Sequence, residues 1–113
     1  MCQIFSNQAP ETYAYQTRSI RLGGHSTSIR LEGAFWQILE EIAARENVSL
    51  PKFLTTLHDE VLEFRGEASN FTSLLRCACV NYVAHVRANP GLGYTLAPEV
   101  GTAASNGEQR IPA

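Results

Sequence analysis

A four-residue repeat constrains the fold of this chain more than any other feature. Residues 19–22 and residues 28–31 both read Ser-Ile-Arg-Leu, and Gly23-Gly24 lies between them. Both pieces alternate polar and apolar residues, which is the period of a strand with one buried and one solvated face. Two glycines supply the positive φ angles of a two-residue hairpin turn. The sequence therefore predicts an antiparallel β-ribbon.

The turn sets the register of this ribbon, with Leu22 opposite His25 and Ser19 opposite Ser28. In that register one face is polar and the other is apolar. The polar face is expected to carry Ser19, Arg21, Ser26, Ser28 and Arg30. The apolar face is expected to carry Ile20, Leu22, Thr27, Ile29 and Leu31.

After the ribbon, apolar residues recur with the spacing of an amphipathic helix, which predicts a first helix over residues 32–46. Asn47 suits the left-handed conformation that ends helices. The apolar stripe consists of Phe35, Trp36, Ile38, Leu39, Ile42 and Ala43. We expect Phe35 and Trp36 to belong to the core rather than to a base-stacking platform.

Two further helices follow. Ser49 is a strong N-cap, Pro51 fits the first turn, and Gly66 is a natural stop. The stripe of this second helix comprises Leu50, Phe53, Leu54, Leu57, Val61 and Phe64. A third helix should start near Asn70 or Thr72 and end before Pro90-Gly91.

A chain of 113 residues has room for one domain. Residues 1–16 lack a sustained period and are expected to form an N-terminal arm, whereas residues 88–113 are rich in Gly and Pro and are expected to form a flexible tail. The domain should span residues 17–87. Its fold class is α+β, mostly α, with a β-ribbon followed by two or three helices.

Because a two-stranded ribbon is marginal alone and leaves an exposed edge, we expect a second copy to complete the core. Two copies of residues 27–31 would pair antiparallel about a twofold axis and close over the helices, giving an intertwined homodimer.

The sequence resembles the ribbon-helix-helix superfamily of Arc-type DNA-binding proteins. The resemblance lies in residues 26–32, 34–36 and 38–43 and continues in residues 47–54. With residues 18–22 before and 70–76 after, the chain is similar to an extended bacterial subgroup that has a preceding strand and a third helix.

The resemblance implies a homodimeric transcription regulator that reads the major groove of double-stranded DNA with an intersubunit β-ribbon. Higher-order association on DNA is also implied. The base-contacting residues would be Ser26, Ser28 and Arg30. The DNA backbone contacts would come from Arg18, Arg21, Ser49, Leu50 and Lys52. Of these, Ser49, Leu50 and Lys52 lie at the start of the second helix, where N–H groups can hold a phosphate.

The residues themselves support this function in part. Residues 17–31 hold three arginines and no acid, so a dimer would gather six arginines and two copies of His25. Arg30 can contact guanine O6 and N7 in bidentate fashion. Against this, the net charge is −2, and residues 32–65 contain seven acids and three bases, which weakens phosphate binding. The alternative is that Arg21 and Arg30 form an ordinary solvated strand face.

Other classes of function find little support. No Cys or His cluster has zinc spacing, and Cys77 and Cys79 should point to opposite sides of a helix, so we expect no metal and no cofactor. A Cys2 nucleophile would need a larger scaffold, and the three histidines are scattered as surface or hydrogen-bonded residues, so no enzyme is expected. No apolar run reaches the roughly 20 residues of a membrane span, and a cytoplasmic location is expected.

Several alternatives stay open. The third helix offers Arg76, His85 and Arg87 as a second basic surface, although a solvated helix face is the simpler interpretation. Tyr13 and Tyr15 could contact either a partner subunit or a DNA backbone. The alternative function is a protein-interaction module, antitoxin-like or an adaptor, whose partner is unknown. For an antitoxin the tail provides few apolar anchors, namely Leu92, Tyr94, Leu96, Val100 and Ile111.

Overall fold

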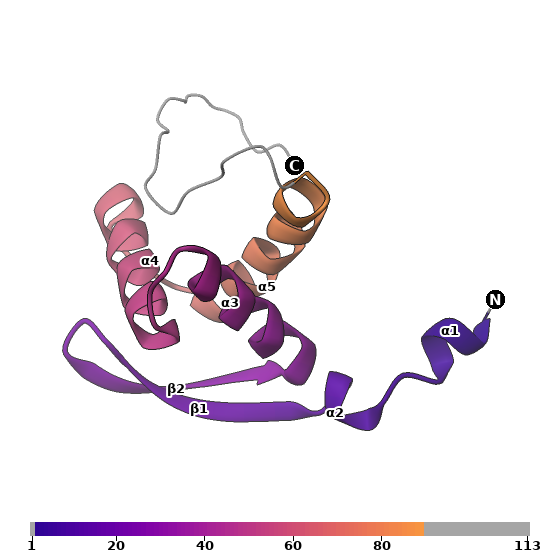
Figure 1. The fold of residues 1–113 in the computed structure, drawn as a ribbon. Coiled ribbons are helices and arrows are strands. Elements are labelled where there is room, and N and C mark those ends of the chain that lie inside the picture. Colours follow the sequence, from indigo (N-terminus) through magenta and orange to yellow (C-terminus); the bar gives the residue numbers. More distant parts are fainter. Residues whose placement is uncertain (1, 90–113) are drawn as a thin grey trace. The chain divides into compact units, whose positions relative to one another are not determined.

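The computed structural model describes residues 2–89, so the expected tail beyond Asn89, with its apolar anchors and the Pro90-Gly91 stop, lies outside the described residues. The chain divides into two compact units, residues 1–79 and residues 80–113. The elements are α1 (Cys2–Ser6), α2 (Pro10–Tyr13), β1 (Tyr15–Leu22), β2 (His25–Glu32), α3 (Gly33–Arg45), α4 (Leu50–Arg65), α5 (Phe71–Asn81) and the π-helix η1 (Tyr82–Arg87) (Figure 1).

The hairpin has the predicted register, with Leu22 opposite His25 and Ser19 opposite Ser28. Gly23 and Gly24 adopt φ angles of 58° and 83°, as the two-residue turn requires. The expected apolar face is buried, since Ile20, Leu22, Ile29 and Leu31 are 0–6% exposed, and Thr27 is half-buried. The α+β, mostly α architecture is therefore confirmed, whereas the pairing of two copies stays a prediction.

The first long helix, α3, starts directly after the ribbon and covers its apolar face. Trp36, Leu39 and Ala43 are buried, as predicted for the stripe, and Phe35 and Ile38 are half-buried. The Trp36 indole N–H donates to the Gln16 carbonyl oxygen at 2.9 Å. Trp36 is thus a core residue. Asn47 follows the C-terminal end of α3 and has a φ of 59°, which is the predicted left-handed conformation.

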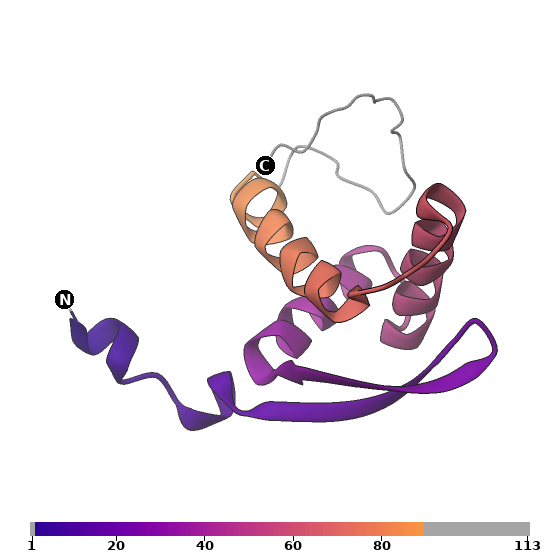
Figure 2. The ribbon, with the colours of Figure 1, turned by 180° about the vertical axis from the view of Figure 1, so that it is seen from behind.

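In α4 the helix signals are confirmed, but only part of the expected stripe is buried. Ser49 caps the helix by accepting a hydrogen bond from the Lys52 N–H at 3.3 Å, and Gly66 ends it with a φ of 79°. Phe53 and Leu54 are buried, whereas Phe64 is 68% exposed. The prediction that Phe64 packs in the core is wrong for the single chain, because α4 runs away from the ribbon and its last turns leave the surface that α3 and β1 cover (Figures 1 and 2).

Helix α5 starts at Phe71, between the two predicted start points, and its α-helical part ends at Asn81. The expected helix continues as η1, so the continuous α-helix predicted up to Pro90 is interrupted. Cys79 is buried and Cys77 is exposed, as their opposite directions predicted. Burial raises the pKa of the Cys79 thiol to about 12, so it stays protonated as a small apolar side chain.

The residues expected to form an N-terminal arm contain the short helices α1 and α2. Strand β1 begins at Tyr15, within the range 1–16 given to the arm. The Gly33 N–H donates to the Ala14 carbonyl oxygen at 2.8 Å. A Cβ atom at position 33 would collide with the backbone carbonyl oxygen of Glu11. The absence of a side chain at Gly33 therefore permits α2 to lie directly on the start of α3.

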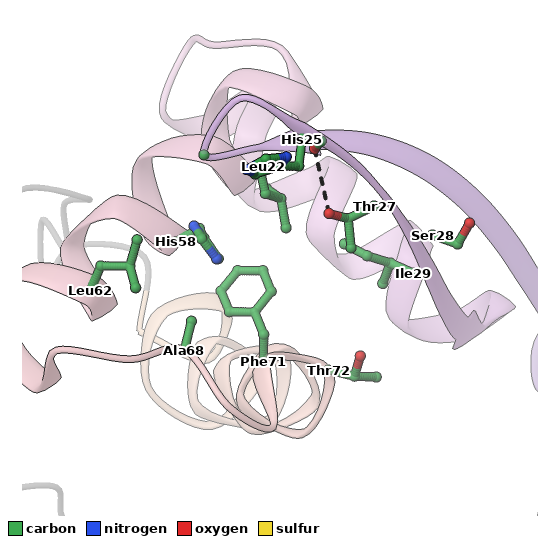
Figure 3. Close-up of a pocket in the computed structure, with 11 residues that line it drawn as sticks. Leu22, His25, Thr27, Ser28, Ile29, His58, Leu62, Ala68, Phe71 and Thr72 are labelled. Carbon is green, nitrogen blue, oxygen red and sulfur yellow. Dashed lines mark hydrogen bonds between the residues drawn. The ribbon is translucent and has the colours of Figure 1, made fainter.

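A pocket of about 390 Å³ lies beneath the hairpin turn, between the ribbon, α4 and the start of α5 (Figure 3). His58 of α4 lines it, and its ring meets the Phe71 ring edge-on with centroids 5.1 Å apart. The His58 Nδ1 atom is buried and has no hydrogen-bond partner. His58 as a whole is half-buried, and its Nδ1 lacks the hydrogen bond expected of a structural histidine.

We predict that Gly33→Ala displaces α2 from α3. The new methyl group would meet the Glu11 carbonyl, so backbone hydrogen exchange should accelerate in residues 10–14 and stay unchanged in residues 36–43. Alanine also favours the helix by up to about 1 kcal/mol relative to glycine, which would offset a loss in the free energy of unfolding. Hydrogen exchange is therefore a better measure here than overall stability. Unchanged exchange in residues 10–14 would show that the close approach is dispensable.

We also predict that His58→Phe raises the free energy of unfolding by about 1 kcal/mol, since it removes a buried nitrogen that lacks a partner and keeps the ring. Urea denaturation of the full chain measures this. The control is His85→Phe, because His85 is exposed and its replacement should change stability by less than about 0.5 kcal/mol. A loss of stability in His58→Phe alone would contradict the prediction.

Candidate nucleic-acid interface

The exposed face of the ribbon carries the residues predicted to contact bases. Ser26, Ser28 and Arg30 alternate along β2 with the buried Ile29 and Leu31, and all three are exposed. From β1, Ser19 and Arg21 lie on the same face, opposite Ser28 and Ser26. The Ser19 and Ser26 hydroxyl oxygens are 3.0 Å apart and share a hydrogen bond. The result is a polar strip in which hydroxyl groups separate two arginines.

Neither Arg21 nor Arg30 forms an ion pair with any of the residues that the structure describes. The Arg30 guanidinium lies over the ring of Tyr15, 4.2 Å from its centroid. Such a contact is worth roughly 0.5–1 kcal/mol at an exposed site and leaves the edge of the guanidinium available for hydrogen bonds. Sequence reasoning left the contact of Tyr15 undecided, although the alternation of β1 puts it on the polar face.

Arg18 lies elsewhere. It is two residues from the buried Ile20 on β1, so its side chain leaves on the face that the helices cover. Its Nη1 donates to the Glu40 Oε2 atom at 2.8 Å, and its guanidinium lies 4.5 Å from the centroid of the Trp36 ring. The structure does not bring Arg18 together with Arg21 and Arg30. Its contact with DNA stays a prediction that this geometry disfavours, and the alternation alone could have shown this.

The second set of predicted contacts lies at the start of α4. Ser49 caps the helix, Leu50 is half-buried, and Lys52 is exposed. The N-terminal end of a helix of 16 residues carries a partial positive charge, to which the Lys52 ammonium adds. This end lies beside the ribbon (Figure 1), and the Thr55 hydroxyl donates to the Arg21 carbonyl oxygen at 3.0 Å. The structure thus brings the first turns of α4 next to the backbone of Arg21, whose side chain leaves on the exposed face.

Glu32 ends β2, and its carboxylate turns to α5. Its Oε1 accepts a hydrogen bond from the Arg76 Nε–H at 3.0 Å. The hydrogen bond from its own backbone N–H, together with Arg76, holds the pKa of Glu32 below its usual value. Sequence reasoning missed this pair, because the two residues are 44 positions apart and no local pattern connects them. Arg76 therefore does not belong to a freely solvated basic face of the third helix.

The two ion pairs change the electrostatic objection to DNA binding. The acids of the helical body are a cost only where their charges face phosphates without compensation. Glu32 is paired with Arg76, and Glu40 is paired with Arg18. Two carboxylates close to the ribbon are therefore neutralised locally.

Residues 2–89 lack two further features, a metal-binding cluster and a membrane-spanning helix. No group of three or more His, Cys, Asp or Glu residues in this part of the chain could hold a metal ion. Across the same residues, no helix has the length and apolar character needed to cross a membrane.

An uncharacterized protein from Bordetella pertussis Tohama I has a similar solved structure, with a TM-score of 0.76 and 41% sequence identity over 88% of this chain and 79% of that chain. No curated protein matches the sequence significantly. Residues 15–83, more than half of the chain, match the family model for the ribbon-helix-helix domain. With its ribbon, its helices and this match, the chain belongs to the ribbon-helix-helix family of DNA-binding regulators.

Proposed function

We propose that this protein is a homodimeric, non-enzymatic transcription regulator that acts in the cytoplasm and reads double-stranded DNA with its ribbon. The observation that carries the proposal is the exposed face of the ribbon, where Arg21 and Arg30 are separated by hydroxyl groups and have no acidic partner among the described residues. A two-stranded ribbon fits the major groove of B-form DNA.

The chemistry of the polar face assigns different tasks to its residues. Arg30 can donate two hydrogen bonds to guanine O6 and N7, which discriminates against other bases. Ser26 and Ser28 can donate to or accept from most base edges, so they would specify weakly. Arg21, the N–H groups around Ser49 and Leu50, and the Lys52 ammonium would contact phosphates and fix the position of the ribbon in the groove.

Dimerisation is supported by what the single chain leaves uncovered. The sheet has the order β1-β2, so one edge of β2 has no strand beside it in the described chain. On α4, Leu62 and Phe64 are 37% and 68% exposed. A second copy that pairs β2 with β2 would supply the missing edge and could cover these side chains. With Arg18 turned inward, such a dimer would present four arginines rather than six.

We predict that the wild-type protein has twice the mass of one chain in light scattering at micromolar concentration. Phe64→Glu should shift the protein toward the monomer, because a carboxylate would replace an apolar side chain at the expected interface. Glu63→Gln, at the neighbouring exposed position, is the control and should leave the mass unchanged. A helical monomer of the wild type under these conditions would refute the dimer.

We predict that selection from random duplexes enriches a motif with the wild-type protein, and that Arg30→Ala loses the preference at one base pair of each half-site. The loss should amount to roughly 1–3 kcal/mol for each contact, measured as affinity for the selected duplex. Arg65→Ala on α4 removes one exposed positive charge away from the ribbon and should keep the motif. If the wild type enriches no motif, or if Arg30→Ala enriches the same one, the proposed readout is wrong.

A protein-interaction module is the second candidate. It is favoured by the exposed apolar side chains of α1, where Ile4 and Phe5 are 74% and 66% exposed. Failure of the duplex selection, together with loss of a captured partner on Ile4→Ser/Phe5→Ser, would support this candidate over the regulator.

A further inference from the structure

Arg30 has an acidic neighbour with which it does not pair. Glu32 follows Arg30 by two residues in β2, so the alternation of a strand would put the two side chains on the same face, with Cα atoms ~7 Å apart. Long side chains at this separation can reach each other easily. A contact between them would occupy the guanidinium that the proposed function assigns to a base.

The carboxylate of Glu32 is held by a residue from a different helix. Arg76 binds it through Nε at 3.0 Å, and the Arg76 guanidinium lies 6.0 Å from the centroid of the Phe35 ring. The two paired side chains are only 33% and 26% exposed. Helix α5 presents Arg76 from a fixed position, because the adjacent Leu75 is fully buried, as is Cys79, whose thiol donates to the Phe35 carbonyl oxygen.

The Arg30 side chain is held by Tyr15. In the register of the hairpin Tyr15 lies opposite Glu32, and its ring covers one face of the Arg30 guanidinium at 4.2 Å. Arg30 is thereby drawn toward β1, while Glu32 is drawn toward α5. The two contacts separate an arginine and a glutamate that their positions in the strand would otherwise bring together.

We propose that Arg76 is a positioning residue for DNA recognition, which binds Glu32 and so keeps the guanidinium of Arg30 free of an acidic partner. This inference rests on the proposed function. It gives the third helix a task in recognition although no residue of that helix lies on the ribbon. Without Arg76, Glu32 could pair with Arg30 at the surface, and this pair would have to break before DNA could bind. The cost of breaking an exposed pair of this kind lowers the affinity for DNA by up to about fivefold for each subunit.

The first experiment needs no DNA. In the full-length wild-type protein, the NMR signal of the Arg76 Nε–H should follow the titration of Glu32, and the signal of the Arg30 Nε–H should not. In Arg76→Ala, the Arg30 signal should follow that titration instead. If the Arg30 signal is insensitive to Glu32 in Arg76→Ala, the inference is wrong, whatever the protein does with DNA.

The second experiment measures affinity for the duplex that the wild-type protein selects. Arg76→Ala should bind up to about fivefold more weakly for each subunit, and adding Glu32→Gln should restore the affinity. Adding Glu63→Gln instead restores the same net charge at a distant exposed position and should not rescue. Equal rescue by Glu63→Gln would reduce the effect to overall charge and overturn the inference.

Glu32→Gln alone keeps the test decisive if Arg76→Ala does not fold. The Glu32 side chain makes no capping hydrogen bond to α3, so its amide should leave the helical circular dichroism unchanged. With Arg30 still free, the affinity for DNA should be unchanged or higher. A loss of affinity in this variant would indicate a structural role for the ion pair and overturn the inference. If the wild type selects no duplex at all, the proposed function fails. The NMR titration still decides whether Arg76 keeps Glu32 from pairing with Arg30.

Discussion

Burial of one face of the hairpin is the constraint on which the rest of this structure depends. A two-stranded ribbon gains too little from its own hydrogen bonds to be stable in water. Here Ile20, Leu22, Ile29 and Leu31 are almost completely buried, so the helices that cover them hold the ribbon in place. Because side chains alternate along a strand, the same arrangement exposes Arg21, Arg30 and the serines. The polar face that could meet DNA is thus a consequence of how the core is made.

Charge is distributed in a way that its total conceals. The net charge of −2 hides a local difference among the described residues: Arg18 and Arg76 pair with acids, whereas Arg21 and Arg30 on the polar face do not. Electrostatic binding to nucleic acid depends on local potential rather than on the total. The ion pair between Glu32 and Arg76 links the third helix to the end of the strand that carries Arg30.

Much of this fold could be predicted because its signals are local. The repeat, the Gly-Gly turn, the Ser49 cap and the positive φ of Asn47 each act within a few residues, and all are confirmed. The failures have long-range causes. Phe64 follows the helical period correctly but is exposed, because nothing in the single chain covers the end of α4. The close approach of α2 to α3 depends on Gly33, whose importance appears only where the Glu11 carbonyl meets it.

The sequence by itself determined the ribbon, its register and the identity of the face that carries Arg21, Ser26, Ser28 and Arg30, because the alternation of a strand is written residue by residue. Only the tertiary structure decided which arginines are available. Arg18 pairs with Glu40 across 22 residues, and Arg76 pairs with Glu32 across 44, so neither contact has a local pattern. Ion pairs form wherever folding brings opposite charges together, and that depends on how the helices pack on the ribbon.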